Sequence, residues 1–247
     1  MESAIEKERF EGSYGQWLKQ QLTSIPTVPW TMFGFGVGAE TVVFLTGTIN
    51  WLTFLSFVGV FFGMGCVCSM SSGHTINGLL GAISVVAYVI VNLQAHHWFS
   101  IIDQLCFFFL IDLELLMTWR TWGRGKNYNI KSLSIKQWTV TVVVILAAWF
   151  GLYHLGLITA DNNPVWDSLA LAIGGTASFL CFRRYTQTYT LWLISDFVNV
   201  ALWFYALKDG YSPASLTMLV MELFYTATAI YGRFFSIWTG KLNRAIN

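Results

Sequence analysis

The sequence predicts an all-helical integral membrane protein, and three observations lead to that fold class. Of the 247 residues, 55% are hydrophobic and only 11% are charged, whereas an average soluble domain carries about 25% charged residues. The apolar residues lie in runs of about 20, the length that a helix needs to cross a bilayer core of roughly 30 Å. Lys and Arg gather on alternate connections between these runs, as in a chain that crosses a membrane several times.

Eight apolar runs, each bounded by charged or turn residues, are the candidate transmembrane helices. They cover residues 29–48, 51–70, 78–98, 101–120, 138–158, 165–183, 188–207 and 214–237. With eight crossings, all but one of the 14 basic residues fall on the side of the N-terminal segment. The positive-inside rule therefore places both termini in the cytoplasm. The exception is Lys208; the others are Lys7, Arg9, Lys19, Arg120, Arg124, Lys126, Lys131, Lys136, Arg183, Arg184, Arg233, Lys241 and Arg244.

The N-terminal segment opens with Glu2, Glu6 and Lys7. A secretory signal needs a basic start followed by an apolar stretch, so no cleaved signal is expected. All four cysteines fall inside apolar runs, and we expect them to be small packing residues. A disulfide framework or a zinc site is not predicted, since no second cysteine pair completes one. These cysteines are Cys66, Cys68, Cys106 and Cys181.

The sequence contains an internal repeat of three helices. The run at 138–158 joins the two copies, so both copies point the same way across the membrane, and the run at 29–48 lies outside them. Parallel repeats of this kind occur in transporters, with the site near the midplane between the copies. Chance identity among apolar residues is the alternative. The matches are Trp51, Gly59 and Cys66 with Trp166, Gly174 and Cys181, spaced by 115 residues, and Leu80, Ile83 and Ser84 with Leu191, Ile194 and Ser195, spaced by 111.

This repeat divides the chain into six parts. Gly59 in the first copy and the pair Gly174-Gly175 in the second are candidate flex points for alternating access, although close helix packing explains such glycines equally well. The parts are a cytoplasmic segment (1–28), an extra transmembrane helix (29–48), the first repeat (49–122), a cytoplasmic loop with the linker helix (123–160), the second repeat (161–238) and a cytoplasmic tail (239–247).

The helix at 188–207 carries a polar and aromatic stripe around Asp196. Eight residues at 1.5 Å each place Asp196 about 12 Å deep, close to the midplane. A carboxylate between aromatic faces suits a small, flat cationic ring, through charge pairing and cation–π contact. The alternative is that the aromatic residues form an interfacial belt and an arginine neutralises Asp196. The stripe consists of Tyr189, Trp192, Asp196, Asn199 and Trp203. Around the helix axis, these side chains lie within about 80° of one another, on a single face.

Other helices contribute further candidate substrate contacts. In the first repeat, Tyr88 and Asn92 occupy the positions that match Asn199 and Trp203, whereas Val85 and Gly81 replace the aspartate and the tryptophan. The expected site is therefore asymmetric. Gln104 near the outer end of its helix, and Glu222 with Tyr225 one turn later, complete the candidate set; a buried Gln also commonly ties two helices together.

The remaining intramembrane polar groups have simpler interpretations. We expect Asp112 and Glu114 to be structural or gating residues paired with arginines such as Arg183 or Arg184. His96, His97 and Asp103 gather near the outer surface. Because adjacent helical histidines point about 100° apart, we expect a solvated rim rather than a metal site. Glu40 is one more carboxylate in an apolar run that needs an explanation.

Several function classes are unsupported. A net charge of +1 gives no electrostatic basis for nucleic-acid binding. The sequence lacks a phosphate-binding P-loop, a lysine in mid-membrane and any hydrolase spacing, so we expect neither an enzyme nor a cofactor. A membrane receptor that binds a ligand without moving it is the non-transport alternative. The sequence does not distinguish a monomer from a homo-oligomer.

The segment Tyr189-x-x-Trp192-x-x-x-Asp196, supported by Gln104, resembles the Trp-x-x-Trp-x-x-x-Asn substrate motif of PnuC-type bacterial vitamin transporters. The resemblance covers roughly residues 50–240. It implies a SWEET-like fold of three plus one plus three helices, and the extra first helix also occurs in that family. Tyr189 replaces the first Trp of the motif and Asp196 replaces its Asn.

The resemblance implies uptake across the bacterial inner membrane by facilitated diffusion, with trapping by a cytoplasmic kinase that phosphorylates the vitamin. The carboxylate of Asp196 favours the thiamine-carrying PnuT branch, because thiamine offers a thiazolium cation and an aminopyrimidine donor. Nicotinamide riboside, which also carries a ring cation, is the alternative substrate. A proton-coupled variant would use Asp196 or Glu222 as the titrating group.

Overall fold

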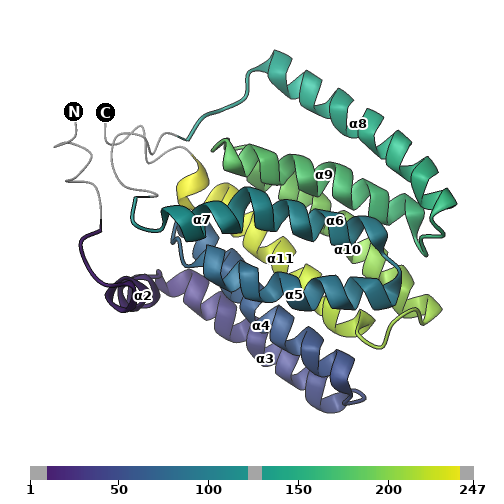
Figure 1. Cartoon of the computed structure of the whole chain (residues 1–247), viewed down its shortest axis with the longest axis horizontal. Coiled ribbons are helices and arrows are strands. Elements are labelled where there is room, and N and C mark those ends of the chain that lie inside the picture. The colour runs from purple at the N-terminus through teal and green to yellow at the C-terminus, as the bar shows by residue number, and fades with distance from the viewer. Residues whose placement is uncertain (1–9, 122–129, 240–247) are drawn as a thin grey trace.

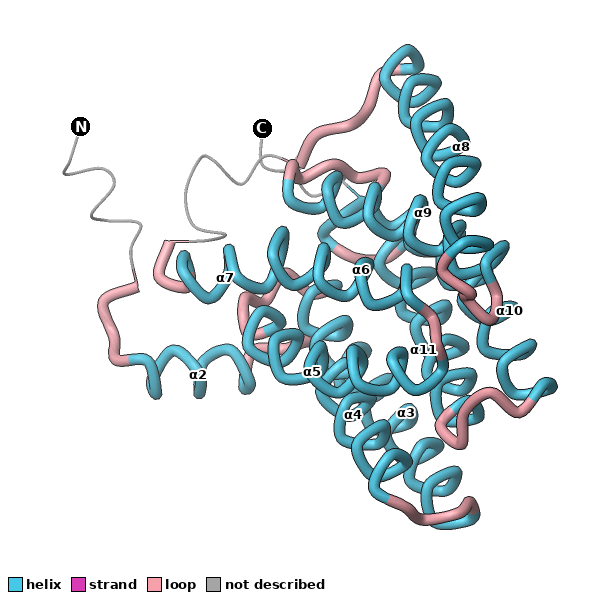
Figure 2. Tube along the Cα trace, turned by 45° about the vertical axis from the view of Figure 1, so that its right-hand side comes forward, coloured by secondary structure: helices cyan, strands magenta, loops and turns pink. Residues whose placement is uncertain are grey.

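The computed structural model describes residues 10–121 and 130–239, and these residues are almost entirely helical (Figures 1 and 2). In chain order, the helices are α2 (Tyr14–Thr23), α3 (Thr27–Thr46), α4 (Trp51–Ser71), α5 (Asn77–Ala95), α6 (Trp98–Phe107), the π-helical η1 (Phe108–Asp112), α7 (Leu113–Thr118), α8 (Ile135–Ile158), α9 (Pro164–Phe182), α10 (Thr188–Asp209), α11 (Ser215–Phe234) and the 3-10 helix η2 (Ile237–Thr239).

Each of the eight predicted ranges contains a helix whose ends lie within a few residues of the prediction. The range 101–120 is occupied by α6, η1 and α7, which follow one another without a break. Among the described residues, six helices are long and apolar enough to cross a membrane by themselves: α3, α4, α5, α8, α9 and α10. The all-helical class is therefore confirmed, whereas the count of eight crossings stays a prediction.

Short-range signals explain where several helices begin and end. Asn50 and Ser134 each accept hydrogen bonds from backbone amides in the first turn of α4 and α8, and form capping boxes with Thr53 and Gln137, which satisfies amides that have no partner within the helix. At the other end, α10 stops at Gly210, whose φ of 71° lies in the left-handed region that glycine adopts without strain.

Helix α2 was not predicted, because the N-terminal segment was expected only as a polar cytoplasmic stretch. Ser13 caps this helix, which lies at one end of the bundle (Figure 2). Trp17 is its buried side chain, with the ring of Trp119 5.3 Å away. His74, in the turn after α4, has its Nε2 3.0 Å from the hydroxyl of Ser24, and burial lowers the pKa of this histidine below its ordinary value. An amphipathic helix therefore packs against this end of the bundle.

The two predicted repeats pack against each other reciprocally. The third helical unit of the first repeat, α6 with η1, packs on α9, the first helix of the second. In the same way α11, the third helix of the second repeat, packs on α4, the first helix of the first. The linker α8 lies at one edge of the bundle against α9, and α3 lies near the opposite edge against α4 and α11 (Figure 1).

Contacts between loops follow the alternation that the predicted topology requires. At one end, the amide of Lys131 donates to the carbonyl of Arg184 at 2.8 Å, and the indole of Trp238 donates to the carbonyl of Met70 at 3.0 Å. At the other end, the Asn162 side chain donates to the carbonyl of Ala95. Loops predicted to share a membrane side thus meet. The basic residues Lys7, Arg9, Arg124, Lys126, Lys241 and Arg244, and positions 240–247 of the predicted tail, lie outside the described residues.

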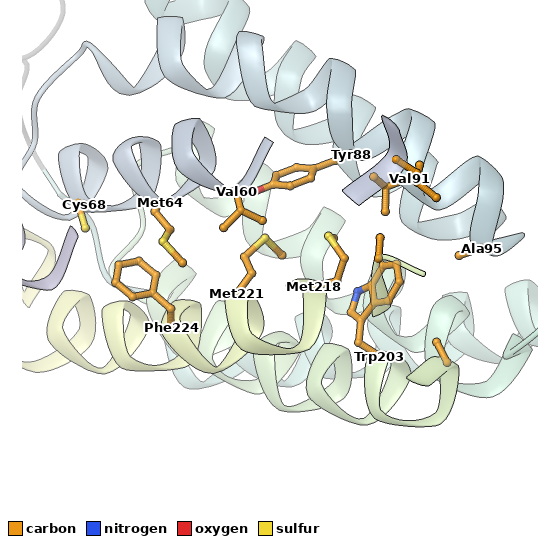
Figure 3. Close-up of a cluster of buried hydrophobic side chains, with 13 residues drawn as sticks. Val60, Met64, Cys68, Tyr88, Val91, Ala95, Trp203, Met218, Met221 and Phe224 are labelled. Carbon is orange, nitrogen blue, oxygen red and sulfur yellow. The ribbon is translucent and has the colours of Figure 1, made fainter. Parts of the chain in front are cut away.

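Apolar side chains fill the bundle and also cover its outside. One core cluster joins α4 and α5 to α10 and α11 through Val60, Tyr88, Met218 and Trp203 (Figure 3). On the periphery, α8 exposes large apolar side chains along most of its length. Exposed apolar surface on this scale is the surface that a bilayer covers.

Candidate functional site

A cavity lies between the two repeats, where α4, α5, α6 and η1 face α9, α10 and α11. Its volume is about 110 Å³, and polar side chains from several helices converge in it, as they do in small-molecule sites. Its polar and aromatic lining includes Ser84, Tyr88, Asp103, Gln104, Phe107, Asp112, Ser178, Tyr189, Trp192, Ser195, Asp196, Asn199, Glu222, Tyr225 and Thr228.

Positions that the predicted repeat matches line this cavity in pairs. Helices α5 and α10 both enter from the end where the basic residues gather, and each presents one face to the cavity. Four pairs of matched positions on these helices line it, and a fifth pair does not. The lining pairs are Gly81 with Trp192, Ser84 with Ser195, Val85 with Asp196 and Tyr88 with Asn199; the fifth is Asn92 with Trp203.

Asn92 and Trp203 lie in the packed bundle beyond the cavity. The Asn92 side chain donates to the backbone carbonyl of Tyr88 at 2.9 Å. Trp203 is 2% exposed and lies beside Val91 and Met218 (Figure 3), with its ring edge-on to His97 at 5.0 Å between centroids. The structure therefore does not bring these two predicted contacts to the cavity.

The other predicted contacts do meet there. Tyr189 stands perpendicular to Trp192, with 5.1 Å between ring centroids, and Phe107 lies 6.0 Å from Trp192. Across the cavity, the hydroxyls of Tyr88 and Tyr225 are 2.9 Å apart and hydrogen-bonded. Gln104, Asp196, Asn199 and Glu222 complete the predicted set in the lining. Aromatic faces and carboxylates thus line the same space.

Asp103 and Asp112 also line this cavity, which corrects two predictions. Asp103 was expected at a solvated rim, and Asp112 was expected to pair with an arginine. Both oxygens of Asp112 are buried without a hydrogen-bond partner, as is Oδ1 of Asp103. Among the residues that the structure describes, no Lys, Arg or His lines the cavity. The arginine that the alternative interpretation requires beside Asp196 is therefore not in the lining.

The π-helix explains why Asp112 reaches the cavity. On a regular α-helix, Asp112 would point about 80° away from Gln104. The π-helical turn of η1 inserts one extra residue, which reduces that angle to about 20°. Such a turn has no signature that hydrophobic periodicity can detect.

Other polar residues lie elsewhere. His97 is fully buried, so the expectation of a solvated rim is wrong for it as well. Glu114 does not line the cavity, and Arg184 lies close enough to act on it electrostatically; an ion pair between them stays a prediction. Glu40 is 1% exposed within α3, and neither of its carboxylate oxygens has a hydrogen-bond partner. The described residues contain no cluster of potential metal ligands.

The candidate flex glycines occupy tight places. A Cβ at Gly59 would meet the Cβ of Ala87 at 2.7 Å, so this glycine permits close packing of α4 on α5. A Cβ at Gly174 would approach Oδ2 of Asp103 to 2.6 Å. Of the three candidates, Gly174 alone lines the cavity, and Gly175 lies beside it in α9. Space requirements therefore account for Gly59 and Gly174, and their hinge role stays a prediction.

Sequence reasoning did not identify Asp167 as important. This buried carboxylate in the first turn of α9 accepts hydrogen bonds from the amides of Phe99 and Ser100, each at 2.8 Å, and from the Ser100 hydroxyl. Asp161 accepts from the amide of Trp98. Together they cap the N-terminus of α6. Two acidic residues beside Pro164 were the available signal, but a cap supplied by another helix cannot be read from local sequence.

Known proteins resemble this chain over most of its length. Nicotinamide riboside transporter PnuC from Neisseria mucosa is 25% identical over 245 residues, covering 92% of this chain and 87% of the relative. PnuC from Escherichia coli, also a nicotinamide riboside transporter, is 24% identical over 191 residues, covering 65% and 77%. A crystal structure of the vitamin B3 transporter PnuC superposes with a TM-score of 0.76 at 21% identity, over 94% of this chain and 99% of that one.

These similarities confirm the predicted PnuC-type resemblance and the helical transporter fold. They do not support the closer relationship to the thiamine-carrying PnuT branch, since the relatives named above are nicotinamide riboside transporters. Residues 53–239 match the family described as nicotinamide mononucleotide transporter. That match spans both repeats and every residue that lines the cavity. The chain is a multi-pass membrane protein that belongs to the nicotinamide mononucleotide transporter family.

Proposed function

We propose that this protein carries nicotinamide riboside across the bacterial inner membrane. One observation supports the assignment most: the matched faces of α5 and α10 line one cavity, which offers Trp192 and Asp196 to a flat cationic ring. The pyridinium of nicotinamide riboside can stack on the indole while the carboxylate balances its charge. The names of the relatives favour the same vitamin.

The proposed substrate contacts are the predicted residues that reach the cavity. Gln104 offers an amide to the substrate carboxamide, and Asn199, Glu222 and the Tyr88–Tyr225 pair offer hydrogen bonds to the ribose hydroxyls. Tyr189 closes the aromatic side next to Trp192. Asn92 and Trp203 support this surface from behind.

We infer that transport is facilitated diffusion, trapped by phosphorylation through a cytoplasmic kinase. The proposed topology has eight crossings: the helix at 29–48, the repeats at 49–122 and 161–238, and the linker helix within 123–160. Segments 1–28 and 239–247 stand in the cytoplasm. The alternation of loop contacts supports this topology, as does the gathering of Lys and Arg at one end. Whether the chain forms a homo-oligomer does not enter the proposal.

The decisive experiment is a parallel titration of the purified protein with nicotinamide riboside and with thiamine, followed by intrinsic fluorescence, since Trp192 lines the cavity. We expect saturable binding of nicotinamide riboside and weaker binding of thiamine. The carboxylate of Asp196 is the one feature that favours thiamine. Tight binding of thiamine alone would overturn the substrate assignment.

Uptake into protein-containing liposomes separates a transporter from a receptor. A transporter fills the lumen with labelled nicotinamide riboside until the inner and outer concentrations are equal. A receptor binds in proportion to protein and leaves the lumen empty. Binding without filling would overturn the transport assignment while leaving the ligand intact.

A further inference from the structure

Four carboxyl groups from four different elements line the cavity between the two repeats. Asp103 comes from α6, Asp112 from η1, Asp196 from α10 and Glu222 from α11. A single ring cation balances one carboxylate, and the described lining contains no basic side chain to balance the others. The number of acidic groups therefore exceeds what a monovalent substrate needs.

Several of these groups are buried without partners. Asp112 is fully buried and neither oxygen accepts a hydrogen bond. Glu222 is 5% exposed, and its Oε2 has no partner either. An ionised carboxylate that is removed from water without a partner is strongly unfavourable, and such a group binds a proton instead. The empty cavity therefore favours neutral carboxyl groups.

Glycines make the room for two of the carboxyl groups. A Cβ at Gly81 would overlap the Asp112 carboxylate, and a Cβ at Gly174 would come within 2.7 Å of both Asp103 oxygens. The two glycines lie on different repeats, in α5 and α9. Both repeats thus leave space where an acidic side chain enters, which indicates that the acidic lining is built into the fold.

The surrounding titratable groups add no positive charge. Asp103, Asp196 and Glu222 line the same cavity from α6, α10 and α11, and carboxylates that share one low-dielectric space repel one another. Glu40 of α3 does not line the cavity, but it lies close enough to Tyr88 to act on it electrostatically. The described titratable groups of the lining are Cys66 of α4, Tyr88 of α5, Asp103 of α6, Asp112 of η1, Tyr189 and Asp196 of α10, and Glu222 and Tyr225 of α11; α9 contributes none.

Resting on the proposed function, we propose that the proton is a second ligand of this cavity. In the empty protein, Asp103, Asp196 and Glu222 together hold at least one proton. Entry of a monovalent aromatic cation breaks one carboxyl O–H bond, the proton leaves to solvent, and the resulting carboxylate pairs with the ring. Charge is conserved, because one cation enters as one proton leaves.

This exchange makes affinity depend on pH in a defined direction. As the pH falls, protons compete more strongly with the cation, so the dissociation constant rises. Where one proton is displaced, affinity changes by up to about tenfold per pH unit. The ring cation of nicotinamide riboside does not titrate, so the dependence belongs to the protein.

Calorimetric titration with nicotinamide riboside in two buffers of different ionisation enthalpy counts the protons released. We expect release in the wild type and in Asp209→Asn, a matched control on an exposed carboxylate of the same helix α10. Glu222→Gln removes one member of the trio and should reduce the release, and Asp103→Asn should do so from a separate helix. Binding without proton release by the wild type, or equal release by all four proteins, would refute the proposal.

Infrared spectroscopy of the ligand-free protein tests the same inference without a substrate. At neutral pH we expect a carbonyl stretch from protonated carboxyl groups that is weaker in Glu222→Gln and unchanged in Asp209→Asn. Any contribution of Glu40 to this infrared band is the same in all three proteins. Failure of nicotinamide riboside to bind would contradict the proposed function, whereas an identical band in the wild type and Glu222→Gln would contradict the proton site.

Discussion

At the residue scale, we expect ligand recognition to depend most on the charge of Asp196. Its helix face is shared with Trp192 and Asn199, and all three line the cavity. We predict that Asp196→Ala weakens binding of nicotinamide riboside by roughly tenfold to a hundredfold, the usual loss of a hydrogen bond to a charged group. Fluorescence titration measures the change, and unchanged melting shows that the fold persists.

The isosteric variant Asp196→Asn separates charge from shape. The amide keeps an acceptor oxygen and reproduces the residue of the motif that this segment resembles. We therefore expect its binding of nicotinamide riboside to lie between that of the wild type and Asp196→Ala. Wild-type affinity in Asp196→Ala would remove this residue from the site.

We predict that Gly81 is required because it leaves room for the side chain of Asp112, and not because it makes the backbone flexible. A methyl group in Gly81→Ala would overlap the Asp112 carboxylate, and overpacking of this kind costs about 1–3 kcal/mol. Shortening the acidic side chain should restore stability, so the double variant Gly81→Ala/Asp112→Ala should melt at a higher temperature than Gly81→Ala alone.

Gly38→Ala is the control for this comparison, since a Cβ there meets no atom within 4 Å. It should melt like the wild type. If Asp112→Ala fails to rescue Gly81→Ala, the contact between the two residues does not explain the glycine.

At the element scale, the start of α6 depends on a carboxylate from α9. Asp167→Ala leaves the buried amides of Phe99 and Ser100 without acceptors, which costs about 1–3 kcal/mol for each unsatisfied group. We predict a clear loss of stability, measured by thermal unfolding in detergent. Asp209→Ala, which removes an exposed carboxylate, should leave the unfolding temperature unchanged. Equal stability of the two variants would show that water replaces the cap.

The sequence predicts the long helices well because each must bury or expose an apolar run of bilayer length, and such runs are visible without any tertiary information. It does not predict α2, which is only 10 residues long and in which Trp17 is the buried side chain. Periodicity also identifies the stripe around Asp196. It assigns Trp203 to the same face, but the helix leaves the cavity before that residue and enters the core.

Asp112 shows what sequence reasoning cannot reach. Its direction depends on the π-helical turn η1, and its burial depends on the absent side chain of Gly81 one helix away. Both causes are tertiary. An isolated carboxylate in an apolar run indicates a functional or paired group, but neither its partner nor the side it faces follows from the run.

At the scale of the whole molecule, the internal repeat and the basic asymmetry describe the same arrangement from different data. The repeat requires that α4 and α9 point the same way across the membrane. The asymmetry of Lys and Arg places the turns after both helices on one side. Loop contacts agree, because Lys131 pairs with the turn after α9 at the end where Trp238 meets Met70. A cavity between two parallel repeats follows from this geometry.

This topology predicts opposite labelling of two exposed basic positions. We expect Lys131→Cys to react with an impermeant thiol reagent only from the cytoplasmic side of oriented vesicles, and Lys208→Cys only from the other side. Both side chains are exposed, so access depends on the membrane alone. A background with Cys66, Cys68, Cys106 and Cys181 replaced by Ala removes native thiols, and uptake of nicotinamide riboside confirms that each variant is folded. The helices α8, α9 and α10 supply three crossings between residues 131 and 208, which places these positions on opposite sides of the membrane. Labelling of both positions from one side would require an even number of crossings between them and would overturn the eight-helix topology.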